Sequence, residues 1–372
     1  MTQQDTKEPG PEQADLPPAP DKPKLLPSPG FAAWLAATDG SLAFSTYQSG
    51  RLFFLGTREG GGLYALDRVV GTAMGLALDA DKLWLGCRDQ VWRFANTGPG
   101  RIEGQGYEAV YLPRTGFLTG QGNIHDVLAD ARFRETRYRF LYANTQFSCI
   151  ATVDEHYGFR PVWTPDFISD LKPEDRCHLN GICAADGELA YATLCGRCDT
   201  PLGWKALQAD GGFAVDVRSG QVVCAGLSMP HSPRWHEGRL WLLNSGEGEL
   251  GWVDPAMARF VPVAHCAGFA RGLAFVGQYA VVALSRLRDT RPGGVMAGIA
   301  LARRLKERRS FQRCGLHIYD LAAGKLAHWL HIDGPVTELY DVAYLPGIAR
   351  PYTAGFSESA LQQGRVHLPQ EA

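Results

Sequence analysis

Short apolar stretches that alternate with polar residues recur along most of the chain, and turn residues separate them. Between residues 229 and 255, Ser232–His236, Arg239–Asn244 and Gly248–Asp254 are predicted to be three successive strands, with a turn at residues 245–247. Strands this short and this close in sequence are typical of a small antiparallel sheet. One such sheet cannot bury its faces alone, so further copies of the pattern are expected.

The apolar pattern that opens this stretch occurs six times, over residues 72–86, 123–144, 178–193, 229–244, 269–284 and 338–347. The positions just before the six predicted inner strands are Met74, His125, Asn180, His231, Arg271 and Tyr340. The spacing between successive positions is close to the length of one propeller blade, about 40–50 residues, with insertions in some loops. The sequence therefore predicts an all-β fold, a six-bladed β-propeller.

The two ends of the chain are expected to close the ring together. Residues 41–47, 51–57 and 62–67 are predicted strands without an inner strand before them, and the sixth inner strand at 338–345 has little sheet after it. The N-terminal strands should therefore complete the blade that the C-terminal strand begins, which removes exposed sheet edges. A seven-bladed alternative would require a strand at Phe31–Ala37, where a short helix is predicted instead.

The propeller is expected to span residues 31–360 as one domain. Residues 1–30, rich in Pro, Gln and charged side chains, are predicted to be a disordered or loosely docked tail, and residues 361–372 a C-terminal tail. Within an insert at 287–314, Val295–Arg309 has helical spacing and a basic C-terminal half. We expect this helix to form a lid over one mouth of the central channel; binding to a partner or to an anionic membrane surface is the alternative.

Charge and composition narrow the compartment and the partners. A formal net charge of −2 over 372 residues argues against a nucleic-acid surface. No apolar run of about 18 residues occurs, so no membrane span is expected. The N-terminus lacks the basic and then apolar pattern of a secretory signal, so the nine cysteines are expected to be reduced thiols of a cytoplasmic protein.

The early residues of the inner strands surround one mouth of a propeller's channel, so these dispersed positions are expected to converge. Side chains two apart along a strand share a face. This alternation places Asn123, His178, Met229 and Glu338 beside the six positions named above. The candidate substrate-binding residues are Asn123, Asn180, Asp126, Met74, Met229 and Asp341.

Three of the chain's ten histidines fall on these equivalent positions, namely His125, His178 and His231. Three neutral imidazoles that meet at one point are a common ligand set for a catalytic divalent metal with an open position, here zinc, copper, iron, manganese or nickel. Tyr340 is then the candidate acid or base, with Arg271 as the anchor for a carboxylate or phosphate. We expect Glu338 either to contact a metal-binding residue from outside or to bind the metal itself as an additional ligand.

The sequence thus predicts a metal-dependent lyase, hydrolase or oxidative enzyme that acts on a small molecule or a peptide. One alternative is a non-catalytic propeller module that uses the same mouth to bind a peptide or a protein partner. A second alternative is that the histidines donate hydrogen bonds to neighbouring blades and only fill the channel.

Several segments, among them EDRCHLNGIC (174–183) and MPHSPRWH (229–236), resemble an uncharacterised bacterial family of conserved hypothetical proteins. The resemblance extends over nearly all of residues 31–350 and implies the propeller fold without an established activity. The sequence departs from the family pattern around Cys195–Cys198, where a more acidic loop without cysteines is expected.

The constellation of three histidines is also similar in kind to the zinc site of the peptide-amidating lyase propellers. The matching residues would be His125, His178, His231, Met229, Arg271 and Tyr340. This likeness concerns the constellation and not the sequence, and it implies metal-dependent lyase chemistry.

Overall fold

The computed structural model describes residues 22–102, 104–291, 294 and 296–356. Over these residues the chain is mostly β-structure, with two short α-helices, α1 (Phe31–Ala37) and α2 (Leu301–Glu307), and one 3-10 helix, η1 (Gly203–Leu207). The predicted all-β class is confirmed.

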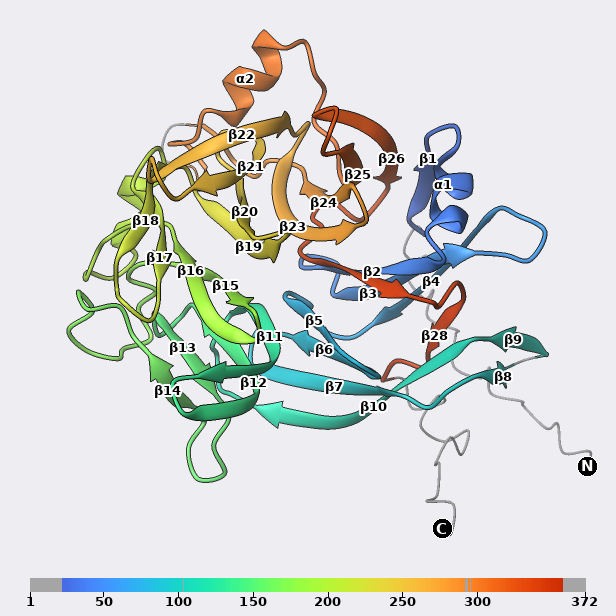
Figure 1. The fold of residues 1–372 in the computed structure, drawn as a ribbon, viewed down its shortest axis with the longest axis horizontal. Helices are drawn as coiled ribbons and strands as arrows, with labels where there is room; N and C mark the ends of the chain where they lie inside the picture. The colour runs from blue at the N-terminus through green and yellow to red at the C-terminus, as the bar shows by residue number, and fades with distance from the viewer. Residues whose placement is uncertain (1–21, 103, 292–293, 295, 357–372) are drawn as a thin grey trace, which may run out of the picture.

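Six strands begin the antiparallel sheets and are called the inner strands: β5 (Leu76–Asp79), β11 (Ile124–Phe133), β15 (Leu179–Ala185), β19 (Pro230–His236), β23 (Phe269–Val276) and β27 (Val342–Pro346). Each inner strand contacts the inner strand of the next sheet, and β27 also contacts β5. Figure 1 shows the sheets following one another around a common centre.

Three further strands follow each inner strand outwards, and a parallel pairing of Arg132 with Glu188 joins the strands of β11 and β15 into one eight-stranded sheet. The second strands are β6 (Lys82–Gly86), β12 (Thr136–Asn144), β16 (Glu188–Leu194), β20 (Arg239–Asn244), β24 (Tyr279–Ser285) and β2 (Gly40–Thr46). The third strands are β7 (Gln90–Asn96), β13 (Cys149–Thr152), β17 (Gly212–Asp216), β21 (Glu249–Asp254), β25 (Gly315–Asp320) and β3 (Arg51–Thr57). The fourth strands are β10 (Ala109–Leu118), β14 (Arg160–Trp163), β18 (Val222–Leu227), β22 (Arg259–His265), β26 (Lys325–Asp333) and β4 (Leu63–Val69).

One sheet combines the two ends of the chain. Strand β27 pairs antiparallel with β2, from Gly40 opposite Pro346 to Phe44 opposite Val342. The hydroxyl of Tyr344 on β27 also donates a hydrogen bond of 2.5 Å to the carbonyl of Thr38, just before β2. The C-terminal inner strand therefore receives its outer strands from the N-terminal part of the chain.

Both ends also add a strand at the outer edge of another sheet. Strand β1 (Lys24–Pro27) pairs antiparallel with β26, and β28 (Pro351–Thr353) pairs parallel with β10. The prediction of a disordered tail over residues 1–30 was therefore wrong for residues 24–27, because Leu25 packs on the core and the strand covers the edge of β26. Residues 1–21 and the predicted tail at 361–372 lie outside the described residues.

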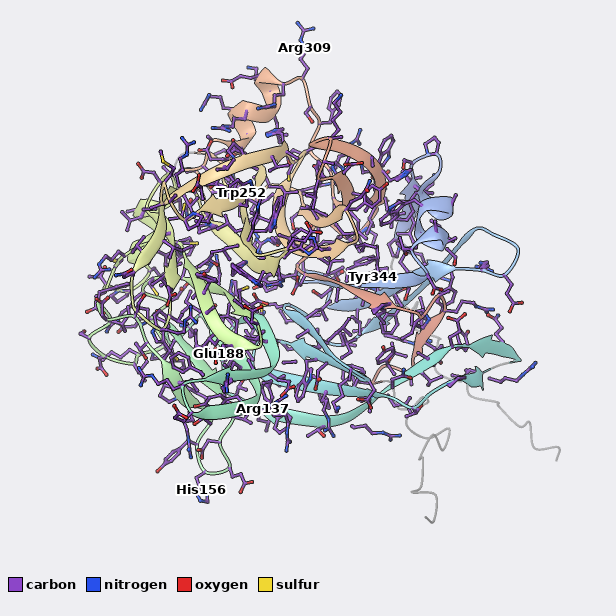
Figure 2. All side chains as sticks on the ribbon, viewed as in Figure 1. Arg137, His156, Glu188, Trp252, Arg309 and Tyr344 are labelled. Carbon is purple, nitrogen blue, oxygen red and sulfur yellow. The ribbon has the colours of Figure 1, made fainter. Side chains whose placement is uncertain are left out.

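One short hairpin and the helices complete the described elements. Strands β8 (Gly100–Ile102) and β9 (Gln105–Tyr107) form a separate two-stranded hairpin. Helix α1 has the bounds that were predicted. Helix α2 is shorter than the predicted Val295–Arg309 and buries Leu301 and Leu305, while Arg309 extends away from the body of the molecule (Figure 2). No helix in the described part of the chain has the length and apolar character to span a bilayer.

The hydrophobic core is divided into clusters that lie between neighbouring sheets. Trp84 of β6, for example, packs against Phe140 of β12 with ring centres 4.6 Å apart. Other clusters join β12 to β16, β17 to β20, and β24 to β2 in the same way. Burial of both faces of each sheet against its neighbours fixes the positions at which the inner strands begin.

Candidate functional site

A cavity of about 220 Å³ lies where the inner strands begin. Side chains at or just before the start of all six inner strands line it: Met74, Asn123, His125, His178, Met229, His231, Arg271 and Tyr340. Connecting segments supply the rest of the wall: Tyr47, Thr145, Asp175, Trp204, Lys205, Arg288 and Met296. The three histidines, Arg271 and Tyr340 predicted from the repeat are thus brought together.

Asn180 is the one repeat position that does not line this cavity. Its amide donates to Cys195 Sγ (3.3 Å) and accepts from the hydroxyl of Thr193 (2.8 Å), so it is held inside the wall. His178, two residues earlier, lies on the cavity in its place. His178 has a φ of 50°, a left-handed conformation that breaks the simple alternation assumed from the sequence.

The residues two before His125 and His231 share this unusual backbone. Asn123 has a φ of 48° and Met229 a φ of 47°. Left-handed conformations are uncommon for residues other than glycine, and they concentrate where a local constraint positions a functional group. In both places the conformation brings the residue's own carbonyl to the imidazole that follows.

These carbonyls fix the tautomer of two histidines. His125 Nδ1 donates to the carbonyl of Asn123 (2.7 Å), and His231 Nδ1 donates to the carbonyl of Met229 (2.9 Å). A carbonyl only accepts, so the proton resides on Nδ1 and the lone pair of Nε2 is left for the cavity.

A hydroxyl that directly follows a second strand also contacts each of these two imidazoles. Thr145 Oγ1 lies 2.8 Å from His125 Nδ1 and donates to the carbonyl of Leu179, on the next inner strand. Ser245 Oγ lies 3.1 Å from His231 Nδ1 and donates to the carbonyl of Ala270, again on the next inner strand. Each imidazole is therefore tied to the contact between two neighbouring sheets.

The Nδ1 atom of His178 is also engaged, but by a carboxylate instead of a carbonyl. Its Nδ1 lies 2.9 Å from a carboxylate oxygen of Asp175, and that oxygen also accepts from the indole of Trp204 (3.1 Å). The Trp204 ring stacks on the imidazole with ring centres 4.0 Å apart. Burial by itself would raise the pKa of Asp175, but the neighbouring His178 holds that pKa below its usual value.

The electrostatics of the cavity keep two of the imidazoles neutral. Burial, followed by the influence of His178, lowers the pKa of His125 to about 3. Burial, followed by the charge of Arg271, lowers the pKa of His231 well below its usual range. The rings of His125 and His178 have centres only 4.8 Å apart.

Arg271 and Tyr340 also line the cavity, and the Tyr340 ring lies beside His125 with ring centres 5.5 Å apart. The guanidinium carbon of Arg271 lies 5.1 Å from the centre of the Tyr340 ring and 5.0 Å from that of Phe269. Within the described residues, neither Arg271 Nε nor the Tyr340 hydroxyl has a hydrogen-bond partner, although both are buried. Burial raises the pKa of Tyr340 above its usual value, so its phenol is protonated at neutral pH.

Glu338, a candidate catalytic residue or ligand, does not line the cavity. It accepts two hydrogen bonds from Arg288, at 3.0 and 2.6 Å, and lies 3.8 Å from Arg271. Burial would raise the pKa of Glu338, but these hydrogen bonds and the two arginines lower it. Its carboxylate is thus engaged in positioning arginines rather than directed at the histidines.

Asp126 and Asp341 were expected to bind substrate, and the structure corrects this expectation. Both lie under the cavity, where Arg234 Nη1 donates to Asp126 (2.9 Å) and Arg234 Nη2 lies 3.3 Å from Asp341. The backbone N–H groups of Ile182 and Leu76 also donate to these carboxylates. Each aspartate follows a cavity residue by one position, so strand alternation turns it to the other side.

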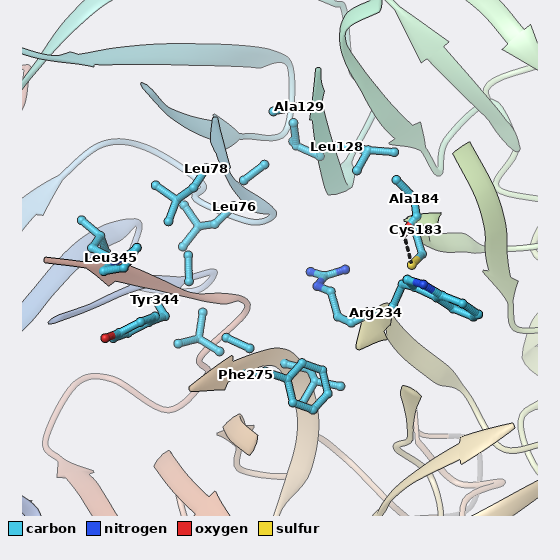
Figure 3. A pocket seen from close by; sticks show the side chains of 18 of the residues that line it. Leu76, Leu78, Leu128, Ala129, Cys183, Ala184, Arg234, Phe275, Tyr344 and Leu345 are labelled. Atoms are coloured by element: carbon cyan, nitrogen blue, oxygen red, sulfur yellow. Dashed lines mark hydrogen bonds between the residues drawn. The ribbon is translucent and has the colours of Figure 1, made fainter. Parts of the chain in front are cut away.

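This charged cluster separates the cavity from a second, wider one. The second cavity has a volume of about 630 Å³ and is lined mainly by apolar side chains of the six inner strands. Figure 3 shows Arg234 directed into it among Leu76, Leu128 and Phe275. The channel is therefore interrupted by Asp126, Arg234 and Asp341.

Several residues of the site were not predicted from the sequence. Trp204 and Lys205 come from η1, and Arg288 and Met296 come from the insert expected to be a lid. Met296 packs with Trp204 and Met229 in one apolar cluster, so the insert covers a side of the cavity. Their positions depend on long connections, for which the repeat pattern gives no signal.

The predicted metal site has suitable donors, but they do not meet in the arrangement of a metal centre. Among the residues that the structure describes, no group of three or more His, Cys, Asp or Glu side chains is placed to hold a metal ion. Cys195 and Cys198 are free thiols, the first buried and the second half-buried.

A family model described as "Domain of unknown function (DUF4915)" matches residues 29–354. The chain belongs to this family. The match covers all six inner strands and every residue of the cavity, so the site lies wholly within the DUF4915 domain. A search of curated proteins gives no match.

One solved structure similar to this chain supports a β-propeller, and two others align more weakly. A nidogen/laminin complex aligns with a TM-score of 0.50 and 13% identity, over 82% of this chain and 98% of that one. The dihydro-haem d1 dehydrogenase NirN aligns with a TM-score of 0.37 and 10% identity, over 82% of this chain and 75% of that one. A luciferin-regenerating enzyme aligns with a TM-score of 0.37 and 10% identity, over 85% and 97%. At these identities the likeness concerns the fold alone.

Proposed function

We propose that the cavity is the active site of a metal-dependent enzyme acting on a small molecule or a peptide. The observation that carries this proposal is the common state of His125, His178 and His231. In each imidazole Nδ1 is engaged by a carbonyl or a carboxylate, which leaves Nε2 for the cavity. Histidines that bind metals usually have this partner on their other ring nitrogen.

The proposal includes a six-bladed ring. Contacts from each inner strand to the next, with β27 against β5, support six blades. Pairing of β27 with β2 supports closure of the ring by both chain ends. Such a ring would explain why six segments far apart in the sequence contribute to one small cavity.

The three imidazoles fit a divalent transition metal by their chemistry, and binding one ion would require their side chains to move together, since the described arrangement does not place them around one point. Two of them are neutral at pH 7, as ligands must be. A bound metal would supply Lewis-acid polarisation of a substrate oxygen or a bound water of lowered pKa. Its identity among zinc, copper, iron, manganese and nickel is left open by an all-imidazole set.

Two residues would act on the substrate directly. Tyr340 is protonated and has a hydroxyl without a partner in the described structure, so we assign it as hydrogen-bond donor and general acid. Arg271 would hold an anionic group of the substrate. Glu338, bound to Arg288 and close to Arg271, would position both guanidinium groups.

The binding-module alternative is favoured by one observation, the lack of a preformed metal site among the described residues. It predicts that Tyr340→Phe leaves ligand affinity unchanged and that neither the wild type nor the variant turns over a substrate, because no proton is transferred. The enzyme proposal predicts that Tyr340→Phe keeps metal binding and lowers turnover by about 10²-fold or more, as for loss of a general acid.

We place the protein in the cytoplasm. All nine cysteines lie in the described residues and are free thiols, eight of them buried, which is the usage expected in a reducing compartment.

The test is the metal content of untagged full-length protein purified without chelators. We expect near-stoichiometric transition metal in the wild type and its loss in His231→Ala and His178→Ala. The matched control is His156→Ala, because His156 lies in an exposed loop that projects from the body of the molecule (Figure 2) and does not line the cavity. Circular dichroism establishes that each variant is folded.

Two results would contradict the proposal. One is wild-type protein that contains no metal and binds none when metals are added back. The other is metal that persists in folded His231→Ala and His178→Ala, because it would then be bound elsewhere.

A further inference from the structure

We propose that Arg271 and Tyr340 form a clamp for the carboxylate of a small ligand. The clamp names the substrate class of the proposed active site and rests on that proposal only for the location of the reacting atoms. Carboxylate binding itself requires no metal, so the two proposals can fail separately.

Arg271 carries a buried positive charge that no carboxylate approaches to hydrogen-bond distance in the described structure. The side chain of Arg271 is only 6% exposed, and its closest carboxylate oxygen, on Glu338, is 3.8 Å away. Glu338 is already bound by Arg288 at 2.6 Å. A buried cation is costly unless it is paired and hydrogen-bonded. An anionic ligand in the cavity would supply the missing partner.

Two neighbouring aromatic rings hold the hydrogen-bond donors of Arg271 in a fixed direction. Arg271 lies between the rings of Phe269 and Tyr340, at 5.0 and 5.1 Å, and such cation–π contacts hold the plane of the guanidinium. Arg271 Nε and the Tyr340 hydroxyl are both buried without partners in the described structure. Two unpartnered donors from residues in contact with each other suit an acceptor with two oxygens.

The cavity is small and has both polar and apolar side chains in its wall. A cavity of about 220 Å³ is smaller than the roughly 300–1,000 Å³ of sites for drug-sized ligands. Met74, Met229, Met296 and Trp204 supply apolar side chains to its wall. A small molecule with an anionic group and an apolar body fits this mixed lining.

A carboxylate matches the site better than a phosphate. Arg288 is neutralised by Glu338, so one guanidinium charge remains to be balanced, that of Arg271. The planar fork of arginine pairs with two carboxylate oxygens in one plane. A phosphate monoester carries a charge near −2 at neutral pH and would need Lys205, which also lines the cavity, as a second cation beside Arg271.

The experiment is calorimetric titration of full-length protein, treated with chelator, with acetate, benzoate and phenylacetate. Benzamide is the uncharged counterpart and phenylphosphonate the phosphate-like one. We expect at least one carboxylate to bind, and benzamide and phenylphosphonate to bind at least about tenfold more weakly. Because it removes the charge, Arg271→Gln should weaken carboxylate binding by about tenfold or more.

Two variants keep the test decisive. Arg137→Gln changes an exposed arginine on the β11–β12 hairpin and should leave binding unchanged. If Arg271→Gln fails to fold, Glu338→Gln takes its place: by removing the competing carboxylate it should tighten binding of the same ligand. The proposal is overturned if no carboxylate binds, if benzamide or phenylphosphonate binds as well, or if the variants leave affinity unchanged.

Discussion

Arg234 is the residue on which the interior of the channel depends most. Its guanidinium contacts Asp126 and Asp341, both of which have side chains only 3% exposed. Removing one partner from a buried ionic cluster leaves uncompensated charge in a medium of low polarity. The cluster also separates the two cavities, so its loss would open one to the other.

We therefore expect Arg234→Met to lower the free energy of unfolding by about 3–5 kcal/mol. Chemical denaturation followed by tryptophan fluorescence measures this value. The matched control is Arg137→Met, which breaks a solvent-exposed pair with Asp130 and should change stability little. Equal stability of the two variants would show that the cluster contributes nothing.

Asp341 makes stability depend on pH. Burial, followed by the nearby Asp126 carboxylate, raises the pKa of Asp341 to about 7 in spite of Arg234. In the unfolded chain the pKa is near 3.8, so between pH 4 and 7 the unfolded state loses a proton that the folded state keeps. The contribution of this group to stability is complete below pH 4 and is lost as the pH rises to 7.

The wild-type protein should therefore lose stability relative to Asp341→Asn as the pH rises from 4 to 7, since asparagine does not titrate. Denaturation midpoints of both proteins across this range test the sign. A difference that stays constant or grows in favour of the wild type would contradict the raised pKa.

At the residue scale, the sequence predicted the convergence of the three histidines, Arg271 and Tyr340 because they occupy equivalent places in a repeat. It misplaced Asp126 and Asp341, although alternation along a strand could have shown that each faces away from its neighbour in the cavity. Arg234 was missed because its partners come from two other inner strands, and no local pattern indicates them.

At the scale of elements, β1 is the strand that could not be predicted from the sequence. A segment with many prolines and charges contains only two consecutive leucines, Leu25 and Leu26. In the structure Leu25 packs against the core beside β26, whereas Leu26 is 36% exposed. The strand forms because β26 offers an unpaired edge, a long-range cause that composition does not reveal.

This alternation gives a prediction for β1. Leu25→Ala should lower the free energy of unfolding by about 1–2 kcal/mol, at the low end for leucines because the side chain is only partly buried. Leu26→Ala, the control in the same strand, should change it by about 0.5 kcal/mol or less. Thermal denaturation compares the two, and equal effects would mean that β1 does not depend on core packing.

Loops limited the prediction of the site more than strands did. Trp204 and Met296 reach the cavity from η1 and from the insert, and both segments are held by apolar contacts with each other. Strand positions follow from periodicity, but the path of a long connection depends on contacts that form only in the folded chain.

The whole molecule follows from repetition. Six similar segments indicated six inner strands, and the structure has six strands in mutual contact around one centre, with the outer strands of the last supplied from the N-terminal part of the chain. This arrangement gathers residues between 74 and 340 into one cavity. Function could be predicted only as far as the donors that gather there, because a site with the same fold can serve many chemistries.

The central claim is that His125, His178 and His231 hold one metal ion through their Nε2 atoms. Anomalous diffraction from crystals of the metal-loaded protein, recorded at the absorption edge of the bound metal, tests it most directly. The account predicts one strong peak in the cavity, about 2.0–2.2 Å from each of the three Nε2 atoms. A peak at Cys195 and Cys198, or no peak in the cavity of a loaded crystal, would contradict it.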